Sequence, residues 1–414
     1  METRYNAVVG QSGGPTCAIN ATLAGVIAGC VEAKANGKID KIYGMKNGME
    51  GFLNKSFIEL EDRFSDKEQL DALCMTPASA LGSCRLKLTK DEQFEATFKI
   101  LEEYNIKYFF YIGGNDSMDA VAKLEKYKKE HPQSNPCDTC FIGVPKTIDN
   151  DLCCTDHTPG FGSAAKYIAT SLAEITRDCE VYLQKAVTIV EIMGRDAGWL
   201  TASAALTKKI CGYGADLIYL PEVAFDTEEF LNNIRRLMEK PGKNSIVVAV
   251  SEGIRDINGD YVGKAAMSGV TDSFGHAYLA GTGKYLENVV REKIGCKCRS
   301  VELNVLQRCA SHLASKTDID ESFRIGKAGV SSALDGKSGR MMVFERKGEG
   351  ENYFCSVNDA DIAGAANNVK KVPAEFISES KTGVTDECIE YLLPLITGEY
   401  EVKFKNGLPV HFVF

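Results

Sequence analysis

A dense polar cluster occurs at residues 145–151, where Pro-Lys-Thr-Ile-Asp-Asn-Asp follows an apolar run. Asp149 and Asp151 supply two carboxylates and Lys146 supplies an amine, whereas a structural turn needs only one Asn or Asp. One carboxylate could accept the proton of a hydroxyl group while the lysine neutralises charge on a transferred phosphoryl group. The cluster therefore predicts group-transfer chemistry, with a merely polar turn as the alternative.

Two glycine turns precede this cluster in the sequence. Gly13 and Gly14 follow one apolar run, and Tyr-Ile-Gly-Gly-Asn-Asp-Ser at 111–117 repeats the design. Backbone amides of a glycine turn at a helix N-terminus can hold a phosphate, and Asp116 offers an oxygen ligand for phosphate-bound Mg²⁺. Neither turn has the spacing of a P-loop or of a dinucleotide site. The alternatives are a tight turn without a ligand, or Asn115 or Asp116 as a helix cap.

Four more charged residues lie where apolar runs begin or end. Arg195 and Glu252 each follow a predicted strand, while Arg299 and Arg308 flank another. A guanidinium group can clamp a phosphate with two parallel hydrogen bonds, and a carboxylate can accept hydrogen bonds from sugar hydroxyls. Each residue alone could form a surface ion pair, but their shared position at strand ends favours one anion-binding site.

These residues are carried by short apolar runs that alternate with longer amphipathic ones. Such alternation predicts an α/β fold with mostly parallel sheets covered by helices on both faces. In doubly wound sheets of this kind, ligands bind beyond the carboxyl ends of the strands. The predicted strands are residues 7–9, 108–112, 140–144, 186–192, 217–220, 246–250 and 300–306, and three predicted helices are 19–34, 92–104 and 163–177.

Length and composition set broad limits on the function. The chain has 414 residues, 44% of them hydrophobic and 25% charged, which is ordinary for a globular protein of two domains. The net charge of −9 disfavours nucleic acid as a partner, because phosphate backbones are bound by clustered Lys and Arg. The sequence has no apolar run of about 18 residues, so no membrane span is expected. The first residues lack a signal-peptide profile, and we expect a cytoplasmic protein.

The 15 cysteines are expected to be mainly reduced. The only group with a metal-like spacing is Cys137 and Cys140 followed by the adjacent Cys153 and Cys154. Neighbouring residues seldom both reach one tetrahedral zinc ion. Free thiols are therefore favoured over a zinc or redox site.

The order of these motifs resembles the phosphofructokinase family. The resemblance covers about residues 5 to 330 and includes Thr-Pro-Gly-Phe-Gly-Ser-Ala at 158–164 and Met-Gly-Arg at 193–195. It implies phosphoryl transfer to the C1 hydroxyl of fructose 6-phosphate, giving fructose 1,6-bisphosphate, with Mg²⁺ as the cofactor. It also implies two Rossmann-like, doubly wound domains with the active site in the cleft between them.

The expected division of the chain follows from that resemblance. A donor-binding domain is expected at residues 1–160 plus about 309–365, and a sugar-phosphate-binding domain at 161–308 plus the C-terminal segment.

The resemblance implies roles for the residues around the transferred group. Asp149 would be the general base for the sugar hydroxyl, supported by Asp151. Thr147 would touch the transferred phosphoryl group, Arg85 would bridge it to the donor, and Arg195 would stabilise the transition state.

Further residues are expected to bind the sugar phosphate. Met193, Gly194 and Glu252 would hold the sugar, and Arg308 its 6-phosphate. Arg299 matches an arginine that family members lend across a subunit interface, which implies a homodimer or homotetramer with shared active sites.

Two positions indicate the phosphoryl donor. Relatives that use ATP have Gly at the positions of Asp116 and Lys146, whereas relatives that use pyrophosphate have Asp and Lys. The Asp side chain fills the space of a nucleotide's α-phosphate and repels its charge, and the lysine supplies a cation beside a compact donor. Together with Gly13 and Gly14, these residues are expected to bind pyrophosphate in a reversible reaction.

The family's magnesium aspartate is Asn115 here, so the metal contact is assigned to Asp116.

Other departures from the family pattern leave alternatives open. A second arginine lent by a partner aligns with Ala186, where Lys185 could substitute, and the His or Tyr of the sugar-phosphate strand is Val305. These changes leave room for a longer sugar such as sedoheptulose 7-phosphate.

Ala24 and Ala28 replace two effector-binding arginines, so no ADP or phosphoenolpyruvate control is expected there. The alternatives are an ATP-dependent 6-phosphofructokinase and a catalytically silent regulatory subunit.

Overall fold

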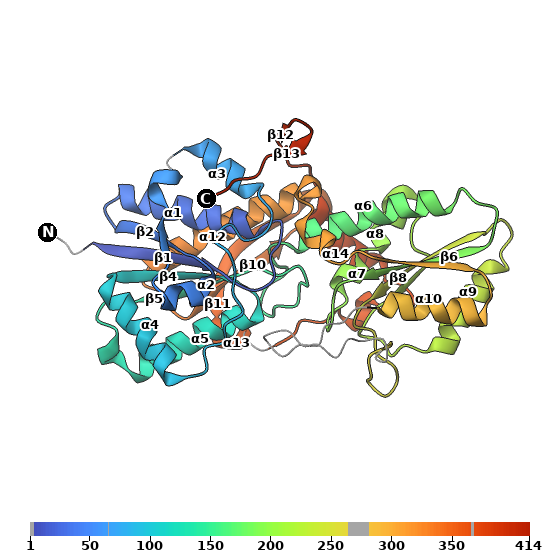
Figure 1. The fold of residues 1–414 in the computed structure, drawn as a ribbon, viewed down its shortest axis with the longest axis horizontal. Coiled ribbons are helices and arrows are strands. Elements are labelled where there is room, and N and C mark those ends of the chain that lie inside the picture. The colour runs from blue at the N-terminus through green and yellow to red at the C-terminus, as the bar shows by residue number, and fades with distance from the viewer. Residues whose placement is uncertain (1–3, 65, 264–280, 366–367) are drawn as a thin grey trace.

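The computed structural model describes residues 4–64, 66–263, 281–365 and 368–414, which form two lobes side by side (Figure 1). Each lobe contains one β-sheet with helices on both faces. Among the described residues, no helix has both the length and the apolar character needed to cross a membrane.

The first lobe contains a seven-stranded sheet in the order β11-β10-β5-β4-β1-β2-β3. Its central pairs are parallel, and the pairs β2–β3 and β10–β11 at the two edges are antiparallel. The strands are β1 (Tyr5–Gln11), β2 (Ile39–Met45), β3 (Phe57–Glu59), β4 (Ile106–Gly113), β5 (Cys140–Pro145), β10 (Arg340–Lys347) and β11 (Phe354–Asp361). Every residue of β5 is buried, as expected for a strand covered on both faces.

Helices from distant parts of the chain cover the first sheet. One face carries α1 (Ile19–Ala35), α3 (Lys67–Cys74) and α12 (Lys316–Leu334), and the other carries α2 (Gly48–Leu53), α4 (Asp91–Glu103), α5 (Asn115–Glu130) and α13 (Ile362–Ala365). Helices α1 and α12 pack closely because glycines face the partner backbone. A Cβ atom on Gly25 would lie 2.0 Å from the carbonyl oxygen of Phe323.

The second lobe contains a four-stranded, fully parallel sheet in the order β7-β8-β6-β9. The strands are β6 (Ala186–Ile192), β7 (Leu217–Tyr219), β8 (Ser245–Ser251) and β9 (Lys297–Glu302). One face is covered by α6 (Phe161–Cys179), α7 (Trp199–Ala202), α8 (Ala205–Cys211) and α14 (Asp386–Leu392), and the other by α9 (Thr227–Met238) and α10 (Thr282–Lys293). The short helix α11 (Leu306–Cys309) follows β9.

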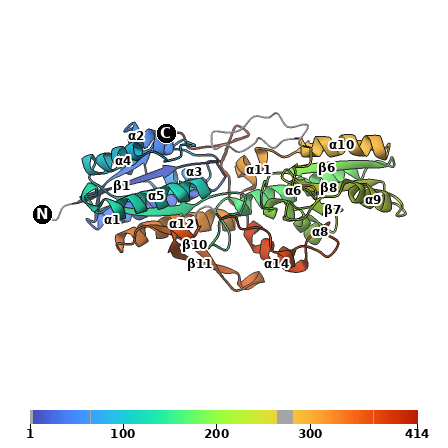
Figure 2. The ribbon, with the colours of Figure 1, turned by 90° about the horizontal axis from the view of Figure 1, so that it is seen from below.

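The C-terminal part of the chain contacts both lobes. Figure 2 shows α14 beside the second lobe, while β10 and β11 form an edge of the sheet of the first lobe. Beyond α14, Tyr400, Phe412 and Phe414 pack against the core of the first lobe. This last stretch includes a short hairpin of β12 (Phe404–Lys405) and β13 (Leu408–Pro409).

The observed elements confirm the predicted α/β class with mostly parallel sheets. One predicted strand, 300–306, is wrong in its second half, because β9 ends at Glu302 and Asn304 takes a left-handed φ of 41°. Arg308 therefore lies on α11 and not at the end of a strand.

Candidate active site

A cavity of about 480 Å³ lies where the carboxyl ends of strands from both sheets face each other. It gathers thirteen of the fifteen residues singled out from the sequence: Gly13, Gly14, Arg85, Asn115, Asp116, Lys146, Thr147, Asp149, Asp151, Met193, Arg195, Glu252 and Arg308. These residues come from the ends of β1, β4, β5, β6 and β8, the α11 region and a loop that contains Arg85.

The loop after β5 places the carboxylates. It is anchored at its start by the backbone amide of Lys146, which donates to the carbonyl oxygen of Gly113 at 2.9 Å. Thr147 then pairs with Gly160 in an isolated bridge, and its hydroxyl accepts a 3.1 Å hydrogen bond from the amide of Asp149. Asn150 turns the chain with a φ of 54°, so Asp149 and Asp151 both line the cavity.

The first glycine turn brings backbone close to two cationic side chains. The Nζ atom of Lys146 donates to the carbonyl oxygen of Gly14 at 2.5 Å. A Cβ atom on Gly13, whose φ is +76°, would lie 3.4 Å from that Nζ atom, and one on Gly14 would lie 3.2 Å from Nη1 of Arg308. Glycine at both positions therefore leaves open a cradle next to two cations, which suits a small anion.

Burial shifts the titration of the ionisable groups in the cavity. Desolvation lowers the pKa of Lys146 to about 8, although the charge of Asp149 acts against this. Desolvation also raises the pKa of Asp149, against the charges of Arg195 and Lys146. For Asp151, burial followed by repulsion from Asp149 raises the pKa to about 7. A carboxylate with a raised pKa is a better proton acceptor, which suits a general base.

The same effects act on Glu252 at the other end of the cavity. Burial, followed by the charge of Asp149, raises the pKa of Glu252 to about 8. The Oε1 atom of Glu252 accepts a 3.3 Å hydrogen bond from the amide of Gly194, which has a φ of +130°. Gly194 does not line the cavity itself, but its amide orients a side chain that does.

The second glycine turn offers oxygen atoms that fit a divalent cation. Asn115 Oδ1 is buried and has no hydrogen-bond partner among the described residues, while its Nδ2 atom donates to Asp151 Oδ2 at 3.4 Å. Asp116 lies beside it and forms a 3.3 Å ion pair with Lys87. An unpartnered amide oxygen next to carboxylates is the donor set that Mg²⁺ prefers.

Arg299 lies outside the cavity. It is on β9, where its Nη1 atom is 3.6 Å from Asp178 Oδ2 and its side chain is 45% exposed. Lys185 also lies outside, because its Nζ atom donates to the carbonyl oxygen of Met238 at 2.6 Å. Val305 is 46% exposed and does not line the cavity.

Beyond the two glycine turns and the 145–151 cluster, four residues of the cavity were not identified from the sequence: Lys87, Asp196, Ala197 and Val369. Lys87 and Asp196 are neighbours of residues that were identified, so their positions next to Arg85 and Arg195 were a usable signal. Val369 comes from the C-terminal part of the chain, and no local pattern around it points to the cavity.

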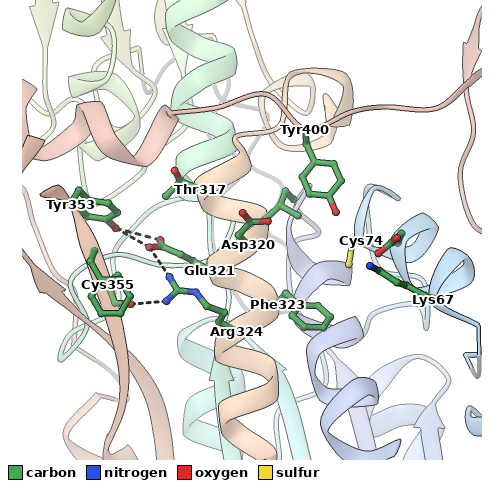
Figure 3. Close-up of a pocket in the computed structure, with 13 residues that line it drawn as sticks. Lys67, Cys74, Thr317, Asp320, Glu321, Phe323, Arg324, Tyr353, Cys355 and Tyr400 are labelled. Atoms are coloured by element: carbon green, nitrogen blue, oxygen red, sulfur yellow. Dashed lines mark hydrogen bonds and ion pairs between the residues drawn. The ribbon is translucent and has the colours of Figure 1, made fainter. Parts of the chain in front are cut away.

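A larger cavity, of about 670 Å³, lies between α3, α12 and β11 (Figure 3). Its polar groups bind one another: Glu321 accepts hydrogen bonds from Arg324 and Tyr353 (Figure 3). Among the described residues, the only close trio of potential metal ligands is His157, Glu321 and Cys355, and the last two of these line this cavity. Both ring nitrogens of His157 already face carboxylates, those of Asp156 and Glu321, so neither is left to bind a metal ion. All cysteines of the chain, including Cys137, Cys140, Cys153 and Cys154, are free thiols.

Comparison with known proteins gives consistent matches. The model of the family described as phosphofructokinase matches residues 6–330. The chain is 40% identical over 414 residues to a pyrophosphate–fructose 6-phosphate 1-phosphotransferase of Halomonas elongata, with 98% of this chain and 95% of the relative covered. A protein of the same name from Xanthomonas campestris is equally similar, at 40% identity with the same coverage. The crystal structure of a pyrophosphate-dependent phosphofructokinase from Nitrosospira multiformis matches with a TM-score of 0.88 and 35% identity, covering 99% of this chain and 96% of the other.

Proposed function

The chain belongs to the phosphofructokinase family, and we propose that it transfers a phosphoryl group reversibly from pyrophosphate to the C1 hydroxyl of fructose 6-phosphate, giving fructose 1,6-bisphosphate. It is an enzyme of the pyrophosphate-dependent type, the type named for relatives that match nearly its whole length. Those names favour this function over ATP-dependent transfer and over a silent regulatory subunit. The observation that carries the proposal is the position of Lys146 and Asp116 beside the Gly13–Gly14 turn.

Pyrophosphate is compact and highly charged, and the cradle at Gly13 and Gly14 has matching properties. The buried Lys146 supplies a cation next to the turn, and Arg85 lines the same cavity. In the low-dielectric interior, cations fixed beforehand stabilise phosphate charge without reorganisation. Asp116 places a carboxylate where a longer nucleotide donor would extend, which disfavours ATP.

The transfer step requires that the C1 hydroxyl of the sugar lose its proton. Asp149 is the proposed acceptor of that proton. Burial raises the pKa of its carboxyl group, while the charges of Arg195 and Lys146 favour the ionised form that can accept a proton. Asp151 lies beside Asp149 and Thr147 lies at the start of the same loop, where it can touch the moving phosphoryl group. Arg195 faces this loop from the second lobe and would stabilise the charge that develops during transfer.

The family implies Mg²⁺, and the second glycine turn fits it. Asp116 and the unpartnered Oδ1 atom of Asn115 would contact the ion. When bound, Mg²⁺ would neutralise charge on the phosphates of the donor. The proposed contact differs from the family pattern because an amide replaces a carboxylate at position 115.

The sugar phosphate is proposed to bind on the side of the second lobe. Glu252, oriented by the amide of Gly194, would accept hydrogen bonds from sugar hydroxyls, and Met193 would pack beside them. Arg308 on α11 would bind the 6-phosphate. Sedoheptulose 7-phosphate is a proposed second substrate, because Ala186 and Val305 replace larger side chains of the family pattern at the phosphate end.

We also propose a homo-oligomer with shared active sites, in the cytoplasm. Arg299 lies on the exposed edge strand β9, outside its own cavity, and Tyr182 lies next to it. Val181 and Leu183 are 69% and 90% exposed, and apolar side chains this exposed are typical of a surface that a second copy covers. Arg299 of one subunit would then reach the sugar-phosphate site of its partner.

The proposed domain division follows the two sheets. The donor-binding part comprises residues 1–160 with about 309–365, and the sugar-phosphate-binding part comprises 161–308 with the C-terminal segment, of which α14 packs on the second lobe.

The reverse reaction tests this function. Purified protein with Mg²⁺, fructose 1,6-bisphosphate and inorganic phosphate is followed by phosphorus NMR. The proposal predicts that pyrophosphate and fructose 6-phosphate appear in equal amounts. Hydrolysis that yields only phosphate, or no conversion, would contradict it.

A further inference from the structure

A short C-terminal stretch, residues 368–372, lies against the loop that carries the two carboxylates. Val369 forms an isolated antiparallel bridge with Leu152. The backbone amide of Lys370 donates to the carbonyl oxygen of Asp151 at 2.8 Å. This stretch lies beyond residues 6–330 that the family model matches, yet Val369 lines the active-site cavity.

The ammonium group of Lys370 is bound on all sides by this loop region. It donates to Asn150 Oδ1 and to the carbonyl oxygen of Thr155, each at 3.2 Å, and to the carbonyl oxygen of Asp156 at 2.6 Å. An ammonium group has three hydrogens, so each of its donors has an acceptor. Its Nζ atom also lies 5.2 Å from the ring centroid of Trp199, in a cation–π contact.

Asn150, the residue between the two carboxylates, is held at both ends of its side chain. Its Oδ1 atom accepts from Lys370, and its Nδ2 atom donates to the hydroxyl oxygen of Tyr391 at 3.0 Å. The Tyr391 hydroxyl in turn donates to the carbonyl oxygen of Asp156 at 2.7 Å. Asn150 is fully buried with a left-handed φ of 54°, a conformation that persists only where the surroundings stabilise it.

The same stretch also contacts the second lobe. Trp199 Nε1 donates to the carbonyl oxygen of Lys370 at 2.9 Å, and Trp199 begins α7, four residues after Arg195. Glu222 Oε1 accepts from the amides of both Gly198 and Val372, at 2.8 and 2.9 Å. Residues 370–372 therefore connect the loop of Asp149 to the segment of Arg195.

We propose that Lys370 is a positioning residue for phosphoryl transfer, which acts together with Tyr391 by clamping Asn150 and so fixing the directions of Asp149 and Asp151. Lys370 has no place in the cavity itself, so it acts through the loop and not by contact with substrate. Loss of the clamp should therefore slow the transfer step more than it weakens substrate binding, because small displacements of catalytic groups reduce rates strongly.

This inference rests on the proposed function, and the two can be separated. Turnover of the unaltered enzyme with pyrophosphate and fructose 6-phosphate is measured first, and its absence would contradict the proposed function. The variants are informative about Lys370 once that turnover is seen.

The test compares Lys370→Ala with Lys371→Ala, which removes an adjacent, exposed lysine. For Lys370→Ala we expect kcat to fall about tenfold or more while the KM values of both substrates change by less than about threefold. Propylammonium, which replaces the atoms removed from Lys370, should raise the kcat of this variant and leave Lys371→Ala and the unaltered enzyme unchanged. Two results for Lys370→Ala would overturn the inference. One is a kcat within about twofold of that of the unaltered enzyme, and the other is a reduced kcat that does not increase when propylammonium is added.

Tyr391→Phe provides a second test that removes only a hydroxyl group and keeps the packing of the ring. If Lys370→Ala does not fold, this variant decides the question. We expect kcat to fall about threefold or more with unchanged KM values, because the side chain of Asn150 loses one of the two hydrogen bonds that fix it. An unchanged kcat in Tyr391→Phe would overturn the inference as well.

Discussion

The Nζ atom of Lys146 donates a hydrogen bond to the carbonyl oxygen of Gly14 at 2.5 Å, although the two residues are 132 positions apart in the sequence. This contact joins the end of β5 to the turn after β1, and it places a buried cation next to Gly13 and Gly14 in the cavity. Because Lys146 and Arg308 lie this close to the turn, a side chain at Gly13 or Gly14 would crowd the cationic groups.

Gly13→Ala should reduce use of pyrophosphate beyond its effect on stability. The left-handed φ of +76° makes alanine strained by about 1–2 kcal/mol, and the new Cβ would lie 3.4 Å from Lys146 Nζ, in the proposed place of a phosphate. We expect kcat/KM for pyrophosphate to fall about tenfold or more. Gly212→Ala is the matched control, since Gly212 has a φ of +79° and no neighbouring atom within 4 Å. Equal activity of the two variants would show that the turn does not hold the donor.

Asp149→Asn should abolish most turnover and preserve substrate binding. The amide cannot accept the hydroxyl proton, so kcat should fall by about 10²–10⁴, while binding of fructose 6-phosphate, measured by calorimetry, changes little. Asp91→Asn, at the exposed start of α4, is the control. Near-normal kcat in Asp149→Asn would move the role of base to another residue.

Arg299→Ala should lower activity, and co-expression with Asp149→Asn should restore part of it. In a mixed dimer, one site would combine the intact Asp149 of the first subunit with the intact Arg299 of the second. The expected recovery is a kcat of the mixture that is measurably higher than that of either variant alone. If the mixture stays as inactive as its parts while dimers form, the active sites are not shared.

Stability should depend on the protonation of His157. Its Nδ1 atom lies 2.9 Å from Asp156 Oδ1 and its Nε2 atom 2.8 Å from Glu321 Oε2, so both nitrogens must carry protons to donate. Burial by itself lowers the pKa of His157, but the hydrogen bonds to Asp156 and Glu321 outweigh it, and the pKa is raised. The stabilisation is therefore complete below the unfolded value of about 6.5 and is lost as the pH rises through the raised value.

Urea unfolding of the unaltered protein and His157→Gln measures this effect. We expect a loss of about 2–4 kcal/mol in the free energy of unfolding near pH 6 and a smaller loss near pH 9. His131→Gln, at the end of α5, is the control. A loss that grows with pH would contradict a charged His157.

The sequence predicted which residues line the cavity best where polar side chains are concentrated in one stretch. The residues of 145–151 could be assigned because two carboxylates and a lysine exceed what a turn needs. The run 300–306 was misread, since alternating apolar residues such as Val301 and Leu303 indicate a strand, whereas the turn at Asn304 ends it. The exposed Val305 and Leu306 begin the helical segment instead.

The contribution of the C-terminal segment could not be predicted in this way. Lys370 lies 220 positions from Asn150, and Tyr391 lies 241 positions from it. Neither residue belongs to a recognisable motif. Each reaches Asn150 only because the C-terminal part of the chain packs against both lobes. Contacts of this kind depend on the complete fold and leave no local pattern.

The choice of donor is tested most directly by forward assays with fructose 6-phosphate and Mg²⁺. Pyrophosphate and ATP are supplied separately, first to the unaltered enzyme and then to the double variant Asp116→Gly, Lys146→Gly. The account predicts turnover of the unaltered enzyme with pyrophosphate and none with ATP. It also predicts that the double variant loses most of its pyrophosphate activity, because the cation beside Gly14 is gone. Turnover of the unaltered enzyme with ATP alone, or full pyrophosphate activity in the double variant, would contradict the roles given to Asp116 and Lys146.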